Sequence, residues 1–260
     1  MISLDQIRNF FPPYLREDPI HQKYLVKEYI QLMVLNFLST TPYIRHITFI
    51  GGTNLRLVKG IDRFSEDIDF DCKEFKKNDF FKMTDEIIRF LEQSGYQITV
   101  RDRTHPKLKS FRRNIFFPQF LFELGLSGHK EERFLLKIET QDPHYLYPQS
   151  MVHIRGCGFF FPFPVPSDEI LCAMKISALI SRRKGRDFYD VMFLLSQITP
   201  DYSFLSEKLN IRDKVSLKAE LLKVASEVDL QDRVRDFSHL AFRQENARGI
   251  LNFKEFVRSI

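Results

Sequence analysis

The feature that most constrains the fold of this chain is the segment from residue 49 to residue 70, FIGGTNLRLVKGIDRFSEDIDF. It predicts a strand, a Gly-Gly turn, a short helix, a loop and a second strand. Successive side chains of a strand point to opposite faces, so Asp67 and Asp69 project together from one face. Ile68 and Phe70 project from the other face, into a core. The segment therefore predicts a strand–helix–strand unit that presents paired carboxylates.

The paired carboxylates need a positive charge between them, because like charges a few ångströms apart repel. Mg²⁺ is the usual cation for hard oxygen ligands and phosphate substrates. The turn at Gly51 and Gly52 opens a helix, whose first free N–H groups can hold a phosphate. These parts predict a nucleoside triphosphate (NTP) site that works through Mg²⁺ or Mn²⁺, with Asp67 and Asp69 as metal ligands. The alternative is a strand whose exposed face merely carries acids.

The turn and the Asp-x-Asp pair resemble the nucleotidyltransferase superfamily that includes DNA polymerase β. The pattern Arg-x-Ser-x-Asp-hydrophobic-Asp is similar to that of the AbiEii/MenT-type nucleotidyltransferase toxins. The resemblance implies an α+β fold, with a polymerase β-like palm of mixed sheet flanked by helices and a helical C-terminal domain. It also implies that the turn and the following loop contact the nucleotide, through Gly51, Gly52, Thr53, Arg63 and Ser65.

A second cluster lies on the strand predicted over residues 134–140, where Lys137 and Glu139 share a face. The superfamily carries a third carboxylate on a neighbouring strand, and Glu139 matches it. The resemblance implies that Glu139 completes the metal site or accepts the proton of the attacking hydroxyl. Lys137 is expected to contact the nucleotide. Alternatively, the two residues form an exposed ion pair.

A third cluster lies between Leu171 and Asp190, and it resembles the same toxin family, which carries a lysine on one helix and Arg-Asp-x-x-Asp at the start of the next. The resemblance implies catalytic roles for Lys175, Asp187 and Asp190, with Lys175 also binding the nucleotide. Lys175 lies in an apolar stripe and needs an anion, either a triphosphate or an aspartate of the next helix. Alternatively, Lys175 and Asp187 form a buried pair, or Asp187 caps its helix.

Basic residues flank these motifs in two runs. A charge run is usually a solvated face, but the position of these runs makes them candidates for an RNA backbone path. The residues expected to bind RNA are Arg101, Arg103, Lys109, Arg112, Arg113, Arg182, Arg183 and Lys184.

Length and composition allow one large domain or two modest ones in 260 residues. We expect a catalytic domain with N-terminal helices over residues 1–165 and a helical domain over 166–260. Strands are predicted at 46–50, 97–100, 114–117, 134–140 and 152–160, and helices at 27–38, 79–94, 168–183, 187–198 and most of 200–260. Three cysteines without a Cys-x-x-Cys pair, and the lack of a signal peptide or membrane span, favour a reduced cytoplasmic protein.

Taken with the resemblance, these motifs predict a metal-dependent nucleotidyltransferase. The family implies the toxin of a type IV-like toxin–antitoxin pair, with a cognate antitoxin, that adds nucleotides from an NTP to the 3′ end of tRNA. A protein or small-molecule acceptor is an alternative, and an NTP-binding regulatory module without turnover is another. A broad basic face favours RNA, whereas an acidic pocket favours an aminoglycoside.

Overall fold

The computed structural model describes residues 2–100 and 110–260, which form two compact units. The first unit comprises Met1–Lys59 and Phe64–Val165, and the second comprises Gly60–Arg63 and Pro166–Ile260. The short segment before the Asp-x-Asp strand therefore belongs with the C-terminal helices, which the sequence did not predict.

The first unit is built on a mixed sheet with the strand order β1-β2-β5-β4-β3. Neighbouring strands are antiparallel except β2 and β5, which run parallel. This arrangement confirms the α+β fold that the sequence predicted, and it places the strand of the two aspartates inside the sheet. The strands are β1 (Ile47–Ile50), β2 (Asp67–Cys72), β3 (Thr99–Val100), β4 (Ser110–Phe117) and β5 (Phe134–Gln141).

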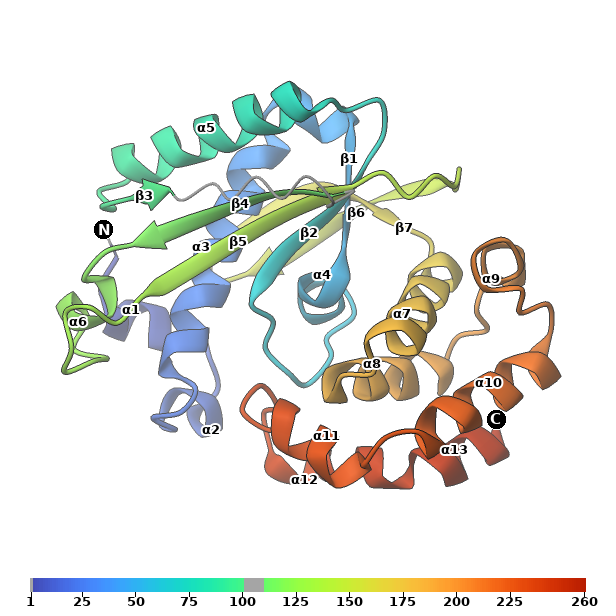
Figure 1. The fold of residues 1–260 in the computed structure, drawn as a ribbon. Coiled ribbons are helices and arrows are strands. Elements are labelled where there is room, and N and C mark those ends of the chain that lie inside the picture. The colour runs from blue at the N-terminus through green and yellow to red at the C-terminus, as the bar shows by residue number, and fades with distance from the viewer. Residues whose placement is uncertain (1, 101–109) are drawn as a thin grey trace. The chain divides into compact units, whose positions relative to one another are not determined.

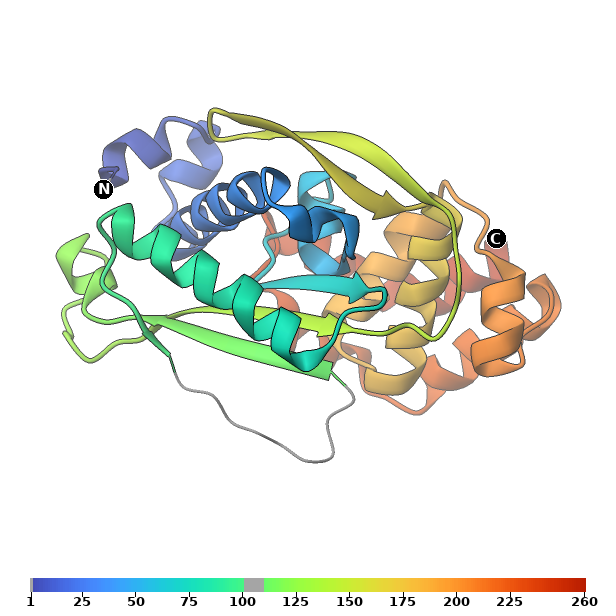
Figure 2. The same cartoon turned by 90° about the horizontal axis from the view of Figure 1, so that it is seen from above.

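Helices cover this sheet, and Figures 1 and 2 show α3 and α5 side by side, with α5 packed against β4. α3 starts earlier than predicted, because Tyr24, Leu25 and Val26 are buried and continue its apolar surface. The helices of the unit are α1 (Leu4–Arg8), α2 (Pro13–Arg16), α3 (Gln22–Ser39), η1 (Pro42–Arg45, 3₁₀), α4 (Gly51–Leu57), α5 (Lys77–Gln93) and α6 (Phe120–Glu123).

A separate hairpin follows the sheet, formed by β6 (Gln149–Gly156) and β7 (Phe159–Pro166). The prediction of one strand over 152–160 was wrong, because Cys157 and Gly158 turn the chain with φ angles of 47° and 82°. Positive φ at both central residues is typical of the tight turns that join antiparallel strands. The prolines of β7 are tolerated because, among the described residues, its one partner is β6.

The second unit is helical, as expected, and the predicted helices at 168–183 and 187–198 are α7 and α8. Ser167 caps α7 by accepting a hydrogen bond from the Ile170 N–H at 3.5 Å. Gly185 begins α8 where a Cβ atom would overlap the carbonyl oxygen of Arg233 on α11. The helices are α7 (Asp168–Arg182), α8 (Gly185–Leu195), α9 (Tyr202–Leu209), α10 (Lys214–Ser226), α11 (Leu230–Phe237), α12 (Gln244–Arg248), η2 (Gly249–Asn252, 3₁₀) and α13 (Phe253–Ser259).

Across residues 2–100 and 110–260, none of the helices combines the length and apolar character needed to cross a bilayer.

Candidate functional site

The strand register brings the predicted acidic residues onto one face of the sheet. Asp69 of β2 lies opposite Glu139 of the parallel strand β5, and Asp67 lies opposite Lys137. Asp67 and Asp69 are partly exposed, whereas Ile68 and Phe70 are fully buried. The alternation that the sequence predicted is therefore present, and the three carboxylates share an accessible face.

Cations lie among these carboxylates. Lys137 Nζ is 2.7 Å from Asp67 Oδ2 and 3.3 Å from Glu139 Oε1. Arg112, which faces Glu139 from β4, forms a second ion pair with that carboxylate. Burial acts to lower the pKa of Lys137, but its contacts with Asp67 and Glu139 outweigh burial and raise the pKa. The ammonium group thus stays charged and offsets the repulsion between the carboxylates.

The donor set suits a divalent cation, because Asp67, Asp69 and Glu139 supply the carboxylate oxygens that Mg²⁺ prefers. The described residues contain no group of three or more His, Cys, Asp or Glu side chains already arranged to hold a metal. A metal at this face has to displace the Lys137 amine, which now supplies the positive charge. The residues therefore fit a metal in identity, and the side chains require rearrangement to bind it.

The Gly-Gly turn is fitted closely against the same face. Gly51 has a φ of 83°, and a Cβ atom there would overlap the carboxylate of Asp69. The hydroxyl of the fully buried Thr53 donates to the carbonyl of Asp67. Gln31, which the sequence did not single out, donates from its side chain to the carbonyl of Ser65 at 3.1 Å. Thr53 and Gln31 thus hold the entry of β2, and the Thr53 side chain contacts backbone.

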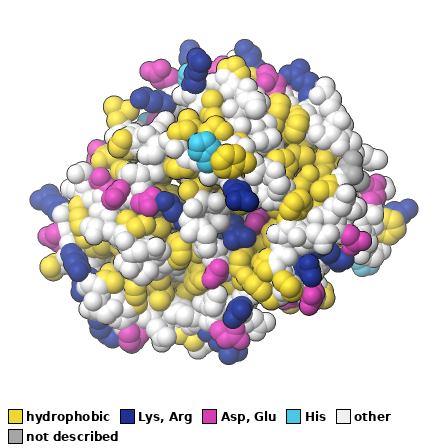
Figure 3. All heavy atoms as spheres, turned by 180° about the vertical axis from the view of Figure 1, so that it is seen from behind, with side chains coloured by type: hydrophobic (Ala, Val, Ile, Leu, Met, Phe, Trp, Pro, Cys, Tyr) yellow, Lys and Arg dark blue, Asp and Glu magenta, His cyan; other side chains and the backbone are white. Residues whose placement is uncertain are grey.

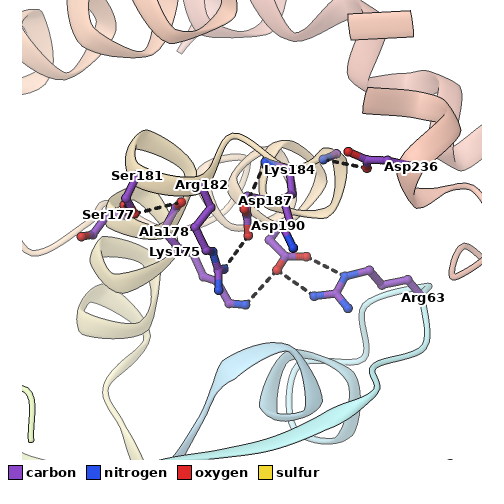
Figure 4. Close-up of polar contacts among 11 residues, drawn as sticks. Arg63, Lys175, Ser177, Ala178, Ser181, Arg182, Lys184, Asp187, Asp190 and Asp236 are labelled. Carbon is purple, nitrogen blue, oxygen red and sulfur yellow. Dashed lines mark hydrogen bonds and ion pairs between the residues drawn. The ribbon is translucent and has the colours of Figure 1, made fainter. Parts of the chain in front are cut away.

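A second charged cluster lies in the helical unit, and Figure 4 shows Arg63 and Lys175 pointing at Asp190. Arg63 Nε and Nη2 are each 2.7 Å from an oxygen of Asp190, and Lys175 Nζ is 2.8 Å from Oδ2. Side-chain exposure is 1% for Arg63 and Asp190 and 8% for Lys175. Burial acts to raise the pKa of Asp190, but Arg63 and Lys175 hold it at about 2. Burial lowers the pKa of Lys175.

Asp187 has different partners from those that the sequence suggested. Its Oδ1 accepts from Arg182 Nη2 at 2.6 Å, and its Oδ2 accepts from the Lys184 backbone N–H at 3.3 Å. The predicted cap is therefore present, and the predicted buried pair of Lys175 with Asp187 is wrong. Asp187 lies in the first turn of α8 and folds back on the helix start, so Asp190, one turn later, meets Lys175 instead.

The residues expected to bind RNA are mostly engaged within the protein. Arg101, Arg103 and Lys109 lie outside the described residues. The described arginines of the two runs all have carboxylate partners, and Lys184 is exposed. On the face drawn in Figure 3, the acidic and basic side chains of the described residues are interspersed. The ion pairs are Arg112 with Glu139, Arg113 with Asp85, Arg182 with Asp187, and Arg183 with Glu227.

A further acid, Asp71, follows the pair on the same strand face and was missed from the sequence. It is 2% exposed and accepts hydrogen bonds from the Tyr147 hydroxyl at 2.6 Å and the Gln141 amide at 3.2 Å. Burial raises the pKa of Asp71 to about 6, and the two hydrogen bonds only partly oppose that shift. The alternation of Asp67, Asp69 and Asp71 was the sequence signal that could have identified it.

Comparison with known proteins places this geometry in context. Residues 34–255 match the family model described as nucleotidyl transferase AbiEii toxin, type IV TA system. The nucleotidyltransferase toxin MenT4 from Mycobacterium tuberculosis has a similar fold, with a TM-score of 0.61, 16% sequence identity, and coverage of 100% of this chain and 91% of that one. JHP933 from Helicobacter pylori gives a TM-score of 0.53, 18% identity, and coverage of 91% and 90%, respectively. Among curated proteins, none matches the chain.

Proposed function

Because the chain belongs to the nucleotidyl transferase AbiEii toxin family and is a nucleotidyltransferase, we propose that it transfers a nucleoside monophosphate (NMP) from an NTP to RNA, at the 3′ hydroxyl of tRNA. The observation that carries this proposal is the accessible face on which Asp67, Asp69 and Glu139 meet beside Gly51. Carboxylates on one face next to a close glycine turn suit the transfer of a phosphoryl group better than the binding of a neutral ligand.

The proposed reaction is an in-line displacement at the α-phosphorus. The acceptor hydroxyl oxygen forms a bond to the α-phosphorus while the bond to the bridging α–β oxygen breaks, and pyrophosphate leaves with that oxygen. Glu139 accepts the proton of the hydroxyl. A divalent cation, which Asp67 and Asp69 would hold, would supply charge neutralisation for the triphosphate and the leaving group.

The contacts of Lys137 give it a specific role in this proposal. In the structure the Lys137 amine contacts both Asp67 and Glu139 and supplies the positive charge between them. If Asp67 and Asp69 held Mg²⁺, that charge would replace the Lys137 ammonium, which would then be free to pair with a phosphate oxygen of the nucleotide. The same side chain therefore offsets the repulsion between the carboxylates and contributes to nucleotide binding.

The family description names a toxin of a type IV toxin–antitoxin system, and we extend this to a cognate antitoxin partner for this chain. We propose that the chain acts in the cytoplasm, which holds both tRNA and NTPs. The 3′ end of tRNA suits this role because it is single-stranded and can enter a site on a small domain.

Incubation with each labelled NTP, with and without total tRNA and with and without a chelator, tests this function. We expect label to appear on tRNA only in the presence of Mg²⁺ or Mn²⁺, and Asp67→Asn to abolish it. Label on protein or on a small molecule would replace tRNA as the acceptor. NTP binding without release of pyrophosphate under any condition would support the regulatory module instead.

A further inference from the structure

A cavity of about 240 Å³ opens in the first unit beside the start of β2. Its walls come from α3, the loop before β2, α6 and the start of β5. Neither the motifs nor the family description assigns a role to it. The lining residues are Lys23, Tyr24, Lys27, Glu66, Leu121, Glu132, Arg133, Phe134 and Leu135.

The cavity is electrostatically connected to the carboxylate face. Lys27, on its wall, interacts with the charges of Glu66, Asp67 and Lys137. Glu66 itself lines the cavity and directly precedes Asp67 in the chain. A group bound in the cavity therefore lies next to the reactive end of β2.

The two metal-binding aspartates proposed on β2 lie next to different parts of the site. Asp69 lies against Gly51, the turn proposed to hold the triphosphate, whereas Asp67 lies toward Glu66 and the cavity. In-line displacement requires the attacking oxygen and the leaving oxygen on opposite sides of the phosphorus. If pyrophosphate leaves on the Gly51 side, the acceptor hydroxyl approaches from the Glu66 side.

The cations around the cavity are held by aromatic rings. Lys23 Nζ lies 5.4 Å from the ring centre of Tyr24, and Lys27 Nζ lies 5.4 Å from that of Phe134. The Arg133 guanidinium lies 5.9 Å from the ring of Phe116. Such contacts orient a cation without neutralising it. We find no ion pair of Lys23, Lys27 or Arg133 within the described residues, unlike the paired arginines at 112, 113, 182 and 183.

A second cavity of about 170 Å³ continues this surface away from the reactive strand. It shares Glu132 and Arg133 with the first and adds Lys130, whose amine lies 5.3 Å from the ring of Phe122. Acidic side chains also line the two cavities, but the row of four basic side chains, Lys23, Lys27, Arg133 and Lys130, suits a chain of phosphates better than one small acceptor.

We propose that this pair of cavities, starting at Lys23, Lys27 and Arg133, is the binding surface for the single-stranded 3′ end of an RNA acceptor. The proposal rests on the proposed function and adds the location of the acceptor. It also replaces the paired arginines that the sequence suggested with cations that have no ion pair among the described residues. Burial lowers the pKa of Lys27, and a phosphate placed near its amine would favour the charged form.

The test compares two full-length variants of equal charge change. One carries Lys23→Ser, Lys27→Ser and Arg133→Ser. The matched control carries Arg212→Ser, Lys214→Ser and Lys223→Ser, at exposed positions of the second unit. Filter binding of end-labelled tRNA is measured at several salt concentrations, and NTP binding and NMP transfer are measured in parallel.

We expect the cavity variant to lower the slope of log K against log salt by about 2, since each phosphate contact to a single strand contributes about 0.7. We expect NTP affinity to be unchanged, and the control to match the wild type. Wild-type transfer to tRNA together with an unchanged slope in the cavity variant would overturn this proposal and leave the function standing. Loss of NTP affinity in the cavity variant would make the cavity the donor site, which also overturns it. Absence of RNA binding and transfer in the wild type would instead reject the proposed function.

Discussion

The two charged clusters of the molecule use the same residue types in opposite ways. In the sheet, Asp67, Lys137 and Glu139 are 20–24% exposed and carry an excess of negative charge. In the helical unit, Arg63, Asp190 and Lys175 are 1–8% exposed and carry an excess of positive charge. Water and ligands can replace the internal ion pairs of the first cluster. The ion pairs of the second cluster can be replaced only if its packed core opens. Membership of a family motif therefore does not tell whether a residue binds a ligand or supports the structure.

The largest effect is expected from Asp190→Ala, which tests whether the buried cluster is structural. The substitution leaves Arg63 and Lys175 buried without their shared carboxylate, and breaking a buried pair costs about 3–5 kcal/mol. Urea unfolding of the full chain measures this loss. Glu227→Ala is the matched control, because its ion pair with Arg183 is partly exposed, and it should cost less than about 1 kcal/mol. Equal costs for the two variants would remove the distinction between the clusters.

Asp69→Asn addresses the exposed cluster and should leave the fold intact while reducing kcat by about 10²–10³-fold, the scale for loss of one group that stabilises charge in a transition state. Unfolding temperature and NMP transfer are measured on the same preparation. Asp85→Asn serves as the control, because Asp85 pairs with Arg113 at a position 54% exposed. Near-normal transfer by the Asp69 variant would mean that this face is not the site of chemistry.

Asp71 sharpens the comparison, because it lies on the exposed cluster's strand but is buried. Its pKa is raised from 3.8 to about 6, so the folded state binds its proton more tightly than the unfolded state. This contribution to stability is present in full below pH 3.8 and is lost as the pH rises through 6, amounting to about 3 kcal/mol. The stability of Asp71→Asn should therefore not decline between pH 4 and 7, whereas the stability of the exposed control Asp5→Asn should decline as in the wild type. Parallel stability curves for wild type and Asp71→Asn would contradict the assignment.

Lys175→Met should have the smallest effect on stability, within about 1 kcal/mol. It removes the surplus buried cation and leaves Arg63 and Asp190 as a two-bond pair, so no buried charge loses its partner, and burial already disfavours the charged amine of Lys175. Urea unfolding measures the stability, and calorimetry with each NTP measures affinity. A fall in NTP affinity at unchanged stability would show that Lys175 contacts the nucleotide, and the buried cluster would then have to open.

The sequence predicted what depends on local periodicity. Neighbouring residues are enough to predict three features. These are the shared strand face of Asp67 and Asp69, the strand that carries Glu139, and the start of the helix after Ser167. Long-range pairing was not accessible, because Arg63 and Asp190 are 127 residues apart and either aspartate of α8 could have met Lys175. The hairpin turn at Cys157 and Gly158 was missed because apolar residues lie on both sides of it, and their pattern indicated one continuous strand. The cavity at Lys27 is formed by four segments of the chain that share no sequence pattern.

The segment Gly60–Arg63 has a consequence for the order in which the protein is completed on the ribosome. Arg63 is synthesised 127 residues before Asp190, which at about 5–20 residues per second corresponds to roughly 6–25 s. By the end of that interval the nascent chain contains every carboxylate of β2 and β5, but Arg63 in the loop before β2 still lacks its carboxylate partner. Arg63 gains its buried partner Asp190 only after α8 emerges. Residues 1–165 expressed alone should therefore show no transfer activity, which a labelled NTP assay can check.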